Sequence, residues 1–475
     1  MSACKWLARA MLAVAFAGVV VYQLCLVFDL NHKNYGEGPI LAFMERMQSE
    51  PLSLAWANQP PYGLSCYGPA FYWLANAAAQ LSGLQHSLIP GRAISFMSAV
   101  IAACLAGIAA SRRTQSLENG LLAAVMFLTS LPVMEWSPFA RVDMLAIMFI
   151  AAAYLVAGVG GRRVTLAAIC IVAGSLAKPT ASLAAIPIFL HLLAHARYRE
   201  ASRFAALVSL LGAATWGFVQ WATNGFFLTS VLVGNRNPMI LWRGYSHTYA
   251  FISSPLAAAA GIVVALQFIA APQRFVRSLY SLAFVVSLAI SAVISCKQGS
   301  EINYFLEPAL LASLAVAIEG LPRLSELNAR RAALAMAFLG AVVAVPNLRE
   351  LKVRYFSPPK RPATFAAVKR ILADEPADVE VLADGRTIPM VLEAGRRPWL
   401  NDPYLYTLLV DNGALDPAPL LDRMKDGRIK WLILRRPVDF HVKYPGCWPP
   451  EALAMIPRHY TLASKAAGLS IYRHR

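Results

Sequence analysis

The chain has 475 residues, of which 58% are hydrophobic and only 15% are charged, and its formal net charge is +17. A soluble domain carries about 25% charged residues, so this composition excludes an ordinary soluble globular protein. The basic balance does not require a nucleic acid partner, because the cytoplasmic loops of membrane proteins collect Lys and Arg. We therefore expect a helical membrane protein.

Eleven apolar stretches are candidates to cross a bilayer. The first, from Ala10 to Phe28, follows Lys5 and Arg9 and is too long for the apolar core of a signal peptide, so we expect a retained anchor. The others lie at 90–110, 117–134, 142–160, 164–177, 180–195, 204–222, 248–271, 279–296, 303–319 and 331–347. The predicted fold class is an α-helical polytopic membrane protein with about 11 transmembrane helices.

The loops between these stretches differ in charge. If the N-terminus lies inside, every inside loop is basic, and the opposite loops hold most of the acidic residues of this part of the chain. The basic loops carry Arg112 and Arg113, Arg162 and Arg163, Arg197 to Arg203, Arg274 and Arg277, and Arg323 to Arg331. The positive-inside rule then predicts that the C-terminus lies outside, in the periplasm of a bacterium, with the chain in the inner (plasma) membrane.

The end of the chain has a different pattern. A transmembrane domain is predicted at residues 1–347 and a small α/β soluble domain at 348–475, after a proline-containing basic connector at 357–362. Short strands are predicted at 379–383, 431–434 and 469–472, and helices near 363–373 and 417–426. The seven cysteines have no metal-ligand spacing, so we expect no cofactor; a divalent metal is compatible with neighbouring acids but is not required.

Two carboxylates follow the first apolar stretch. Asp29 lies at its end, and Glu37 lies between Gly36 and Gly38. Glycines on both sides let the backbone approach a bound group, and a carboxylate there suits a general base for an acceptor hydroxyl. A solvated acid in a turn is an equally open interpretation.

Further polar groups interrupt the apolar pattern at the predicted outer face. Tyr67 and Tyr72 belong to an aromatic cluster that is typical of an interfacial belt but could also stack on a sugar ring. Arg141 and Asp143 begin a span, where charged groups are costly and face a cavity or a partner by default. The remaining candidates are Lys178, Arg243, Lys297, Asn303, Tyr304 and Glu307.

These residue types fit one reaction. A lipid phosphate needs cations, a sugar needs aromatic surfaces and hydrogen-bonding acids, and transfer to a hydroxyl needs a base. Their combination on one face of a membrane bundle indicates lipid-linked glycosyl transfer.

The same segments resemble the GT-C superfamily of polyprenyl-phosphate-sugar-dependent glycosyltransferases, especially bacterial relatives of protein O-mannosyltransferases and of the lipid A aminoarabinose transferase. The motifs that carry the resemblance, in chain order, are Asn34 to Pro39, Tyr67 to Tyr72, Arg141 to Asp143, Lys178-Pro179 and Asn303 to Glu307. The resemblance implies a catalytic acid in the first outer loop, a donor phosphate bound by basic residues of later loops, and inversion at the anomeric carbon.

The chain departs from the family pattern in two places. It has no adjacent Asp-Glu pair in the first outer loop, so the base is Asp29 or Glu37, and the position of Glu37 in the acid motif favours it. Gly68 stands where the family favours proline.

The predicted mechanism uses Glu37 as the base, with the phosphate stabilised by the basic residues and the sugar bound by the polar ones. The phosphate-binding candidates are Arg141, Lys178, Arg243 and Lys297, and the sugar- or acceptor-binding candidates are Tyr67, Tyr72, Asp143, Asn303, Tyr304 and Glu307. The expected partners are a polyprenyl-phosphate sugar donor, an envelope acceptor and the lipid bilayer, without nucleic acid.

Two other functions fit the same composition. A lipid-linked sugar transporter or flippase would use intramembrane charges along a path, and it predicts internal inverted repeats, which the sequence does not show. A non-catalytic membrane assembly subunit with the same fold is the second alternative.

Overall fold

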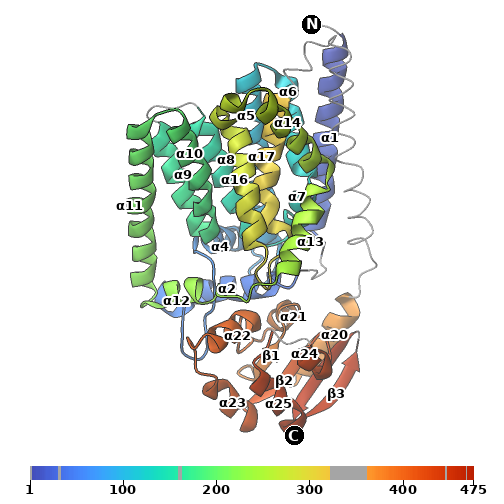
Figure 1. Cartoon of the computed structure of the whole chain (residues 1–475). Coiled ribbons are helices and arrows are strands. Elements are labelled where there is room, and N and C mark those ends of the chain that lie inside the picture. Colours follow the sequence, from blue (N-terminus) through green and yellow to red (C-terminus); the bar gives the residue numbers. More distant parts are fainter. Residues whose placement is uncertain (1–2, 30–33, 159–162, 321–360, 444–446, 467) are drawn as a thin grey trace.

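The computed structural model describes residues 3–29, 34–158, 163–320, 361–443, 447–466 and 468–475. The apolar stretch predicted at 331–347 and the predicted boundary between residues 347 and 348 lie outside this part of the chain. Figure 1 shows a bundle of helices with the C-terminal elements packed together at one end of it. The exact division into two domains stays a prediction.

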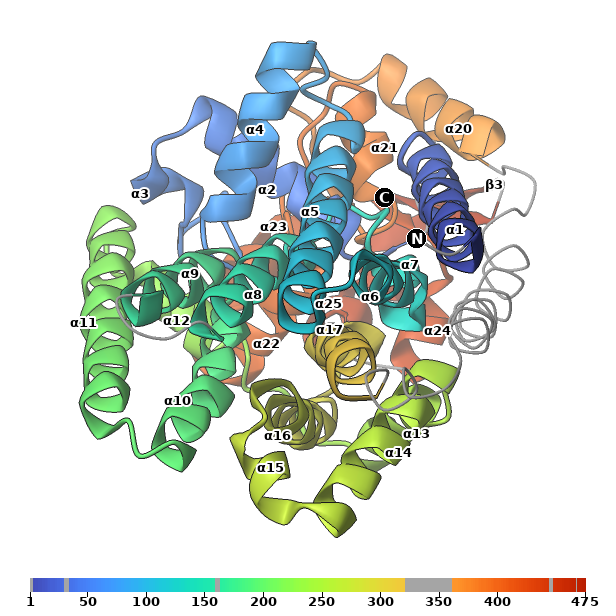
Figure 2. The same cartoon turned by 90° about the horizontal axis from the view of Figure 1, so that it is seen from above.

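Helices dominate the chain up to residue 320, and the view along the bundle in Figure 2 shows them side by side. Every apolar stretch predicted in this part coincides with helical segments. The segments are α1 (Ala3–Val27), α2 (Glu37–Ser49), α3 (Leu52–Ala55), α4 (Ala70–Ser82), α5 (Ile89–Thr114), α6 (Leu117–Thr129), α7 (Leu131–Trp136), α8 (Asp143–Ala157), α9 (Arg163–Ala177), η1 (Pro179–Ala184), α10 (Ala185–Ala194), α11 (Tyr198–Ala222), α12 (Phe226–Leu232), α13 (Leu241–Ile252), α14 (Pro255–Ala270), α15 (Pro272–Arg277), α16 (Leu279–Ile294), η2 (Ile302–Phe305), α17 (Leu306–Ala315) and η3 (Val316–Gly320).

Within the described residues, four helices are long and apolar enough to cross a membrane alone. They are Arg9–Val27, α5, α11 and the continuous run Ile302–Gly320. The pair α13 and α14 meets the same criteria together and bends by 81°, which gives a fifth candidate. Other apolar helices, such as the 15-residue α8, are shorter. The chain is thus a helical membrane protein, and about eleven crossings remain a prediction.

Two stretches predicted as continuous helices are broken. The stretch at 117–134 is interrupted after Thr129, because Ser130 has an extended backbone and Pro132 lies in the first turn of α7. The stretch at 248–271 breaks before Pro255, and the Ser254 side chain accepts a hydrogen bond from Ala257 N to cap α14. Proline suits a helix start, where its missing N–H is not needed, so both predictions of a single helix were wrong.

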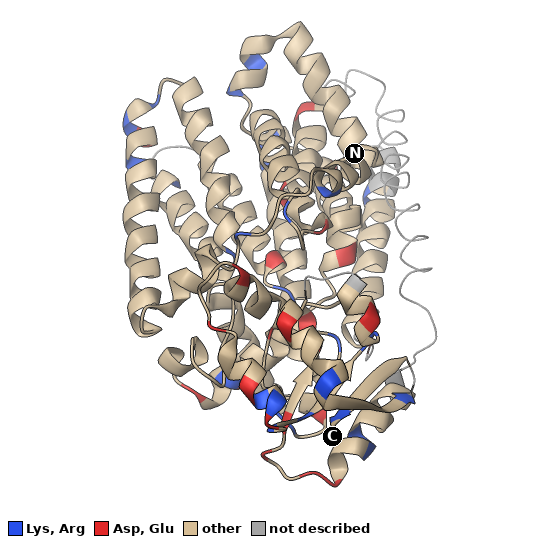
Figure 3. Cartoon of the chain, turned by 60° about the horizontal axis from the view of Figure 1, so that its bottom comes forward, with Lys and Arg blue, Asp and Glu red and all other residues tan. Residues whose placement is uncertain are grey.

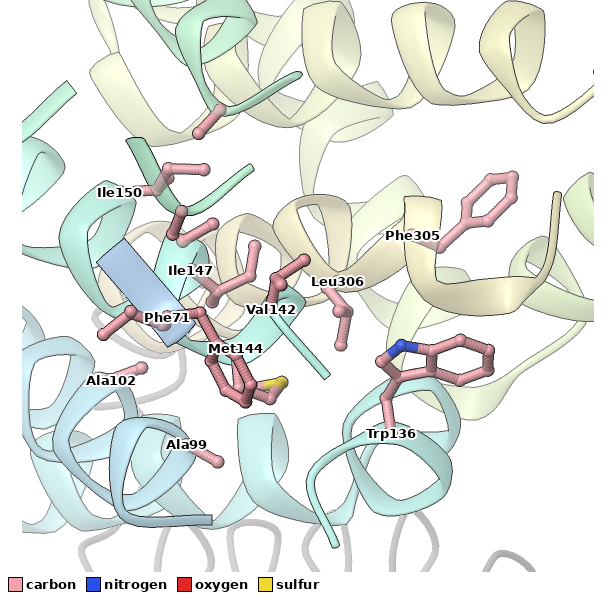
Figure 4. Packing of buried hydrophobic residues seen from close by; sticks show 14 of the residues in the cluster. Phe71, Ala99, Ala102, Trp136, Val142, Met144, Ile147, Ile150, Phe305 and Leu306 are labelled. Atoms are coloured by element: carbon pink, nitrogen blue, oxygen red, sulfur yellow. The ribbon is translucent and has the colours of Figure 1, made fainter. Parts of the chain in front are cut away.

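The centre of the bundle is closely packed because small residues lie where helices meet. A Cβ atom on Gly120 of α6 would lie 2.7 Å from the carbonyl oxygen of Gly107 of α5, so this approach requires glycine. Figure 4 shows Ala99 of α5 and Met144 of α8 among the buried side chains. Small residues allow membrane helices to pack closely. This packing fixes the start of α8, where Asp143 lies.

The C-terminal region contains a four-stranded sheet in the order β1-β2-β4-β3. β1 (Glu380–Ala383) and β2 (Ile429–Leu434) are parallel, whereas β4 (Leu469–His474) pairs antiparallel with β2 and with β3 (Tyr460–Ala466). The prediction of strands was right for β1, β2 and β4 and missed β3, which follows α25 without a turn residue between them. The helices here are α20 (Arg361–Ala373), α21 (Ile388–Glu393), α22 (Pro403–Asp411), α23 (Ala418–Lys425), α24 (Val438–Lys443) and α25 (Pro450–His459).

The C-terminal region contacts the start of α2 and the loop before α4. A Cβ atom on Gly38 would lie 1.8 Å from the carbonyl oxygen of Gly385, so the two backbones meet directly. The Asn401 side chain donates to Leu64 O at 2.7 Å and accepts from Leu64 N at 2.9 Å. Figure 3 shows many charged residues in the C-terminal region, whereas the bundle helices are mostly uncharged. The region therefore covers one end of the bundle.

Candidate functional site

Asp143, at the first position of α8, organises a cluster of polar side chains. It is 1% exposed and accepts hydrogen bonds from Trp136 Nε1 at 2.9 Å, Lys178 Nζ at 2.6 Å and Asn303 Nδ2 at 2.7 Å. Arg141 Nε lies 3.7 Å from its Oδ2. A buried carboxylate requires such partners. Asp143 thus holds two cations and an amide in fixed positions.

Lys178 owes its position to the break between α9 and η1. It precedes Pro179, which disfavours a helical backbone, and Lys178 is extended with φ −137° and ψ 119°. Its ammonium lies 4.6 Å from the centre of the Tyr304 ring, within range of a cation–π interaction. The break in the helix therefore supplies a cation with an aromatic neighbour.

Arg141 lies in the turn before α8 and is nearly buried, with a side-chain exposure of 13%. Its Nη2 donates to Tyr67 Oη at 3.2 Å, and its guanidinium carbon lies 5.6 Å from the Trp136 ring centre. Ser95 Oγ binds both its backbone carbonyl and its backbone N–H. A Cβ atom on Gly36 would lie 1.4 Å from Arg141 Nη1, so the guanidinium occupies space that only glycine leaves free.

These side chains line a cavity of about 370 Å³, here called the bundle cavity. Arg141, Lys178 and Lys297 contribute three positive charges to its wall. Its other lining residues are Cys66, Tyr67, Trp136, Pro179, Thr180, Ser182, Leu183, Trp216, Val231, Leu232, Asn235, Gly299, Glu301, Asn303 and Tyr304. The cavity thus combines three cations and one carboxylate, that of Glu301, with aromatic and aliphatic surface, and this excess of positive charge suits an anionic group attached to an apolar chain.

A second cavity of about 150 Å³ lies between the bundle and the C-terminal region and is called the interface cavity. Arg141, Tyr67 and Tyr304 line both cavities, so the two are neighbours. Tyr72 lines the interface cavity and exchanges a hydrogen bond with Ser65 Oγ at 2.9 Å. Of the three tyrosines predicted to bind a sugar or acceptor, Tyr67 and Tyr304 therefore lie at this junction, and Tyr72 lines the interface cavity alone.

Glu37 has a different environment from the one expected for a free base. It is fully buried, and Oε1 accepts from Arg92 Nε at 2.7 Å and from Ala140 N at 2.9 Å, while Oε2 accepts from Arg92 Nη2 at 2.8 Å. Arg92 also donates to the Asp29 carbonyl oxygen. Neither Glu37 nor Asp29 lines the bundle cavity or the interface cavity. Both acids therefore gather around Arg92, and their catalytic role stays a prediction.

Two other predicted residues lie beside the cluster. Arg243 Nη1 donates to the carbonyl oxygen of Ser300 at 3.3 Å and does not line the bundle cavity. Glu307 Oε1 accepts a hydrogen bond from Tyr154 Oη at 2.7 Å, and Glu307 lines a small pocket of about 40 Å³ next to Asp143. The structure thus brings Glu307 near the cluster and binds Arg243 to the loop that carries Lys297.

Sequence reasoning missed Arg92 and Trp136 as parts of this site. Arg92 lies at the start of an apolar helix, where a charge is costly. The same cost of a charge in an apolar segment indicated Arg141, and it would also have indicated Arg92. Trp136 shortly precedes Arg141 in the chain, and nothing in the sequence indicates that its indole donates to Asp143.

Two solved structures are similar to this chain over most of its length. ArnT from Cupriavidus metallidurans, bound to undecaprenyl phosphate, superposes with a TM-score of 0.63 at 12% identity, covering 99% of this chain and 98% of that chain. The oligosaccharyltransferase AglB from Archaeoglobus fulgidus, in complex with an inhibitory peptide and a dolichol-phosphate, superposes with a TM-score of 0.60 at 11% identity, covering 96% of this chain and 72% of that chain. The chain has the GT-C fold. No protein-family model and no curated protein sequence matches it.

The departure at Gly68 from the GT-C sequence pattern has a structural reason. A Cβ atom on Gly68 would lie 2.1 Å from the carbonyl oxygen of Leu176 at the end of α9. Proline carries a Cβ atom, so it cannot stand here without moving α9. The close approach brings the aromatic segment against α9, the helix that ends just before Lys178.

Among the described residues, no three His, Cys, Asp or Glu side chains are grouped so that they could hold a metal ion. That the activity needs no divalent metal stays a prediction.

Proposed function

We propose that this protein is an inverting glycosyltransferase that moves a hexosyl or pentosyl group from a polyprenyl phosphate to an acceptor of the cell envelope. The observation that carries the proposal is the bundle cavity, where Arg141, Lys178 and Lys297 face one space and Asp143 orients two of them. Preorganised cations stabilise a leaving phosphate because its negative charge grows as the bond to the sugar breaks. The GT-C fold supports the same reaction class.

In the proposed reaction, the acceptor oxygen attacks the anomeric carbon while the bond from that carbon to the phosphate oxygen breaks. The electron pair of that bond remains on the phosphate. Arg141 offers a planar fork for two phosphate oxygens, and Lys178 offers a compact charge. Arg243 supports the loop of Lys297 through its hydrogen bond to Ser300 O.

The sugar has suitable partners at the junction of the two cavities. Tyr67 and Tyr304 present aromatic surface there, and the Oδ1 atom of Asn303 is buried without a hydrogen-bond partner among the described residues. An unpartnered acceptor is costly, and a sugar hydroxyl would satisfy it. We propose that Tyr72 and Glu307, which line the neighbouring pockets, support the residues that bind the sugar.

The reaction also needs a base. The sequence predicts Glu37 or Asp29 for this role. Oε1 of Glu37 accepts two hydrogen bonds and Oε2 accepts one, so an acceptor hydroxyl could reach this fully buried carboxylate only at the remaining lone pair of Oε2 and only if the packing around it opened. The proposed reaction class therefore does not depend on which acid is the base.

The apolar part of the donor would lie along the aliphatic wall of the bundle cavity, at Leu183, Val231 and Leu232. We propose that this end of the bundle faces the periplasm and that the chain lies in the inner membrane. In support, α11 begins at the bundle end far from the C-terminal region, and its start carries Arg199 and Arg203, as the positive-inside rule requires of a cytoplasmic end.

The test uses the purified full chain in nanodiscs. It is given undecaprenyl phosphate carrying one of several hexoses or pentoses, together with an extract of envelope glycans and lipids, and the release of undecaprenyl phosphate is measured. We expect release with at least one donor, and less release for Lys178→Ala, with Lys369→Ala outside the site as the control. Movement of the intact donor between leaflets without any release would replace this proposal with a flippase.

A further inference from the structure

The interface cavity is built partly by the C-terminal region. Asp402 and Tyr404, at the start of α22, close one side of it, and Tyr35, Tyr67 and Arg141 line the other sides. Because Arg141 also lines the bundle cavity, a group bound in the interface cavity would lie directly beside the proposed phosphate site. This position fits the acceptor of the transfer reaction.

Buried polar atoms in the interface cavity lack partners. Asn237 Oδ1 is buried and accepts no hydrogen bond from any described residue, and Tyr35 Oη is buried facing the Tyr404 backbone N–H, with no acceptor for its own proton among the described residues. The amide nitrogen of Asn237 donates hydrogen bonds to Gln298 O and to Tyr404 Oη. These two bonds fix the orientation of the side-chain amide and leave Oδ1 without a donor. One donor and one acceptor in a small polar cavity match a hydroxyl-bearing ligand, because a hydroxyl both donates and accepts.

Asp402 is the carboxylate of this cavity. Its Oδ1 accepts a hydrogen bond from Leu405 N at 3.1 Å and caps α22, whose first residue is Pro403. Burial raises the pKa of Asp402 to about 6, although the Leu405 N–H and the charge of Arg141 favour the ionised form. A carboxylate with this pKa is ionised at neutral pH and more basic than an exposed aspartate, which suits a general base.

We propose that the interface cavity binds the hydroxyl of the acceptor and that Asp402, rather than Glu37 or Asp29, receives its proton. This inference rests on the proposed glycosyl transfer. The acceptor O–H bond breaks and the proton passes to the Asp402 carboxylate. The electron pair of that bond forms the new bond to the anomeric carbon, and the sugar–phosphate bond breaks, with its electron pair left on the phosphate. The protonated Asp402 then loses its proton to water when the product leaves.

The arrangement of the two cavities matches inversion. An inverting displacement needs the nucleophile on the side of the anomeric carbon opposite to the leaving group. Of these two cavities, the bundle cavity alone is lined by Lys178 and Lys297 and the interface cavity alone by Asp402, whereas Arg141 and Tyr67 lie at the shared wall. A sugar held at that wall would have cations on one side and a base on the other. Glu37 lines neither cavity and has Arg92 bound to both of its oxygens.

The decisive variant is Asp402→Asn. Asparagine caps a helix about as well as aspartate does, so a purely structural Asp402 would tolerate the change with little loss of stability or turnover. Loss of a general base lowers turnover by roughly 10²- to 10⁴-fold. We therefore expect unchanged thermal unfolding and unchanged binding of undecaprenyl phosphate, with release of undecaprenyl phosphate reduced by that factor.

A pH profile adds a second readout. For wild type, kcat/KM for the envelope extract should rise with pH through a midpoint at about 6 and then level off, because the carboxylate must be ionised. Burial raises the pKa of the thiol and phenol groups nearby, so they do not ionise in this range; these groups are Tyr35, Cys66, Tyr67, Tyr72, Tyr404 and Cys447. The rising limb should be absent in Asp402→Asn.

The matched control is Asp416→Asn, because Asp416 is an exposed aspartate that accepts from Ala418 N at the start of α23. It should keep wild-type turnover and the wild-type pH profile. Turnover of Asp402→Asn within twofold of wild type, or loss of the rising limb in Glu37→Gln or Asp29→Asn instead, would overturn the assignment of Asp402 while leaving glycosyl transfer intact. If wild type releases no undecaprenyl phosphate with any donor, both the assignment of Asp402 as the base and the proposed glycosyl transfer are wrong.

Discussion

Gly36→Ala tests whether Arg141 must occupy its observed position. Gly36 has φ −73° and ψ −9°, a conformation that alanine adopts without strain. The new Cβ atom would nevertheless lie 1.4 Å from Arg141 Nη1 and 2.7 Å from its guanidinium carbon. The two groups cannot coexist, so the guanidinium must leave the space beside Tyr67 and Asp143. The substitution therefore displaces a cation without removing it.

The expected size of the effect follows from the contacts that Arg141 would lose. Its hydrogen bond to Tyr67 Oη is 3.2 Å long, and its Nε lies 3.7 Å from Asp143. Loss of one hydrogen bond to a charged group costs about 1.5–3 kcal/mol. If that interaction acts in the transition state, turnover falls roughly 10- to 160-fold at about 1.36 kcal/mol per tenfold change.

The assay is release of undecaprenyl phosphate in nanodiscs for Gly36→Ala, Arg141→Ala and the double variant. Because both changes act on the same guanidinium, the double variant should be no slower than Arg141→Ala. Gly212→Ala is the matched control, since a Cβ atom there has no neighbour within 4 Å. Wild-type turnover of Gly36→Ala, or fully additive losses in the double variant, would refute the reasoning.

Three further outcomes are expected. Glu37→Gln removes the carboxylate that the buried Arg92 binds through two of its nitrogens and should lower stability by about 3–5 kcal/mol in denaturant-induced unfolding, with partial recovery when Arg92→Met is added; an equally stable single variant would contradict the ion pair. Arg141→Lys keeps the charge but loses the planar fork, so its release of undecaprenyl phosphate should lie between wild type and Arg141→Ala, and wild-type release would exclude bidentate binding. A reporter fused after Arg475 should be active only outside the cytoplasm, and a cytoplasmic signal would remove one crossing from the predicted topology.

The sequence by itself determined the class of protein and much of the candidate site. Apolar stretches predicted the helices because hydropathy is a local property that the bilayer selects directly. Arg141, Asp143 and Lys178 were recognised because a charge within apolar sequence is costly wherever the helices pack. The breaks before Pro132 and Pro255 were missed, although their local signals were present, because the surrounding apolar residues continued without interruption.

Only the tertiary structure decided which of these groups meet. Glu37 and Arg92 are 55 positions apart, and Asp143 and Asn303 are 160 positions apart, yet each pair forms a hydrogen bond. Asp402 looks like an ordinary helix cap in the sequence, and its position in a cavity beside Arg141 depends on how the C-terminal region packs on the bundle. A side chain's burial and partners depend on segments distant in the chain, so the sequence indicated which residues are unusual and the packing assigned their partners.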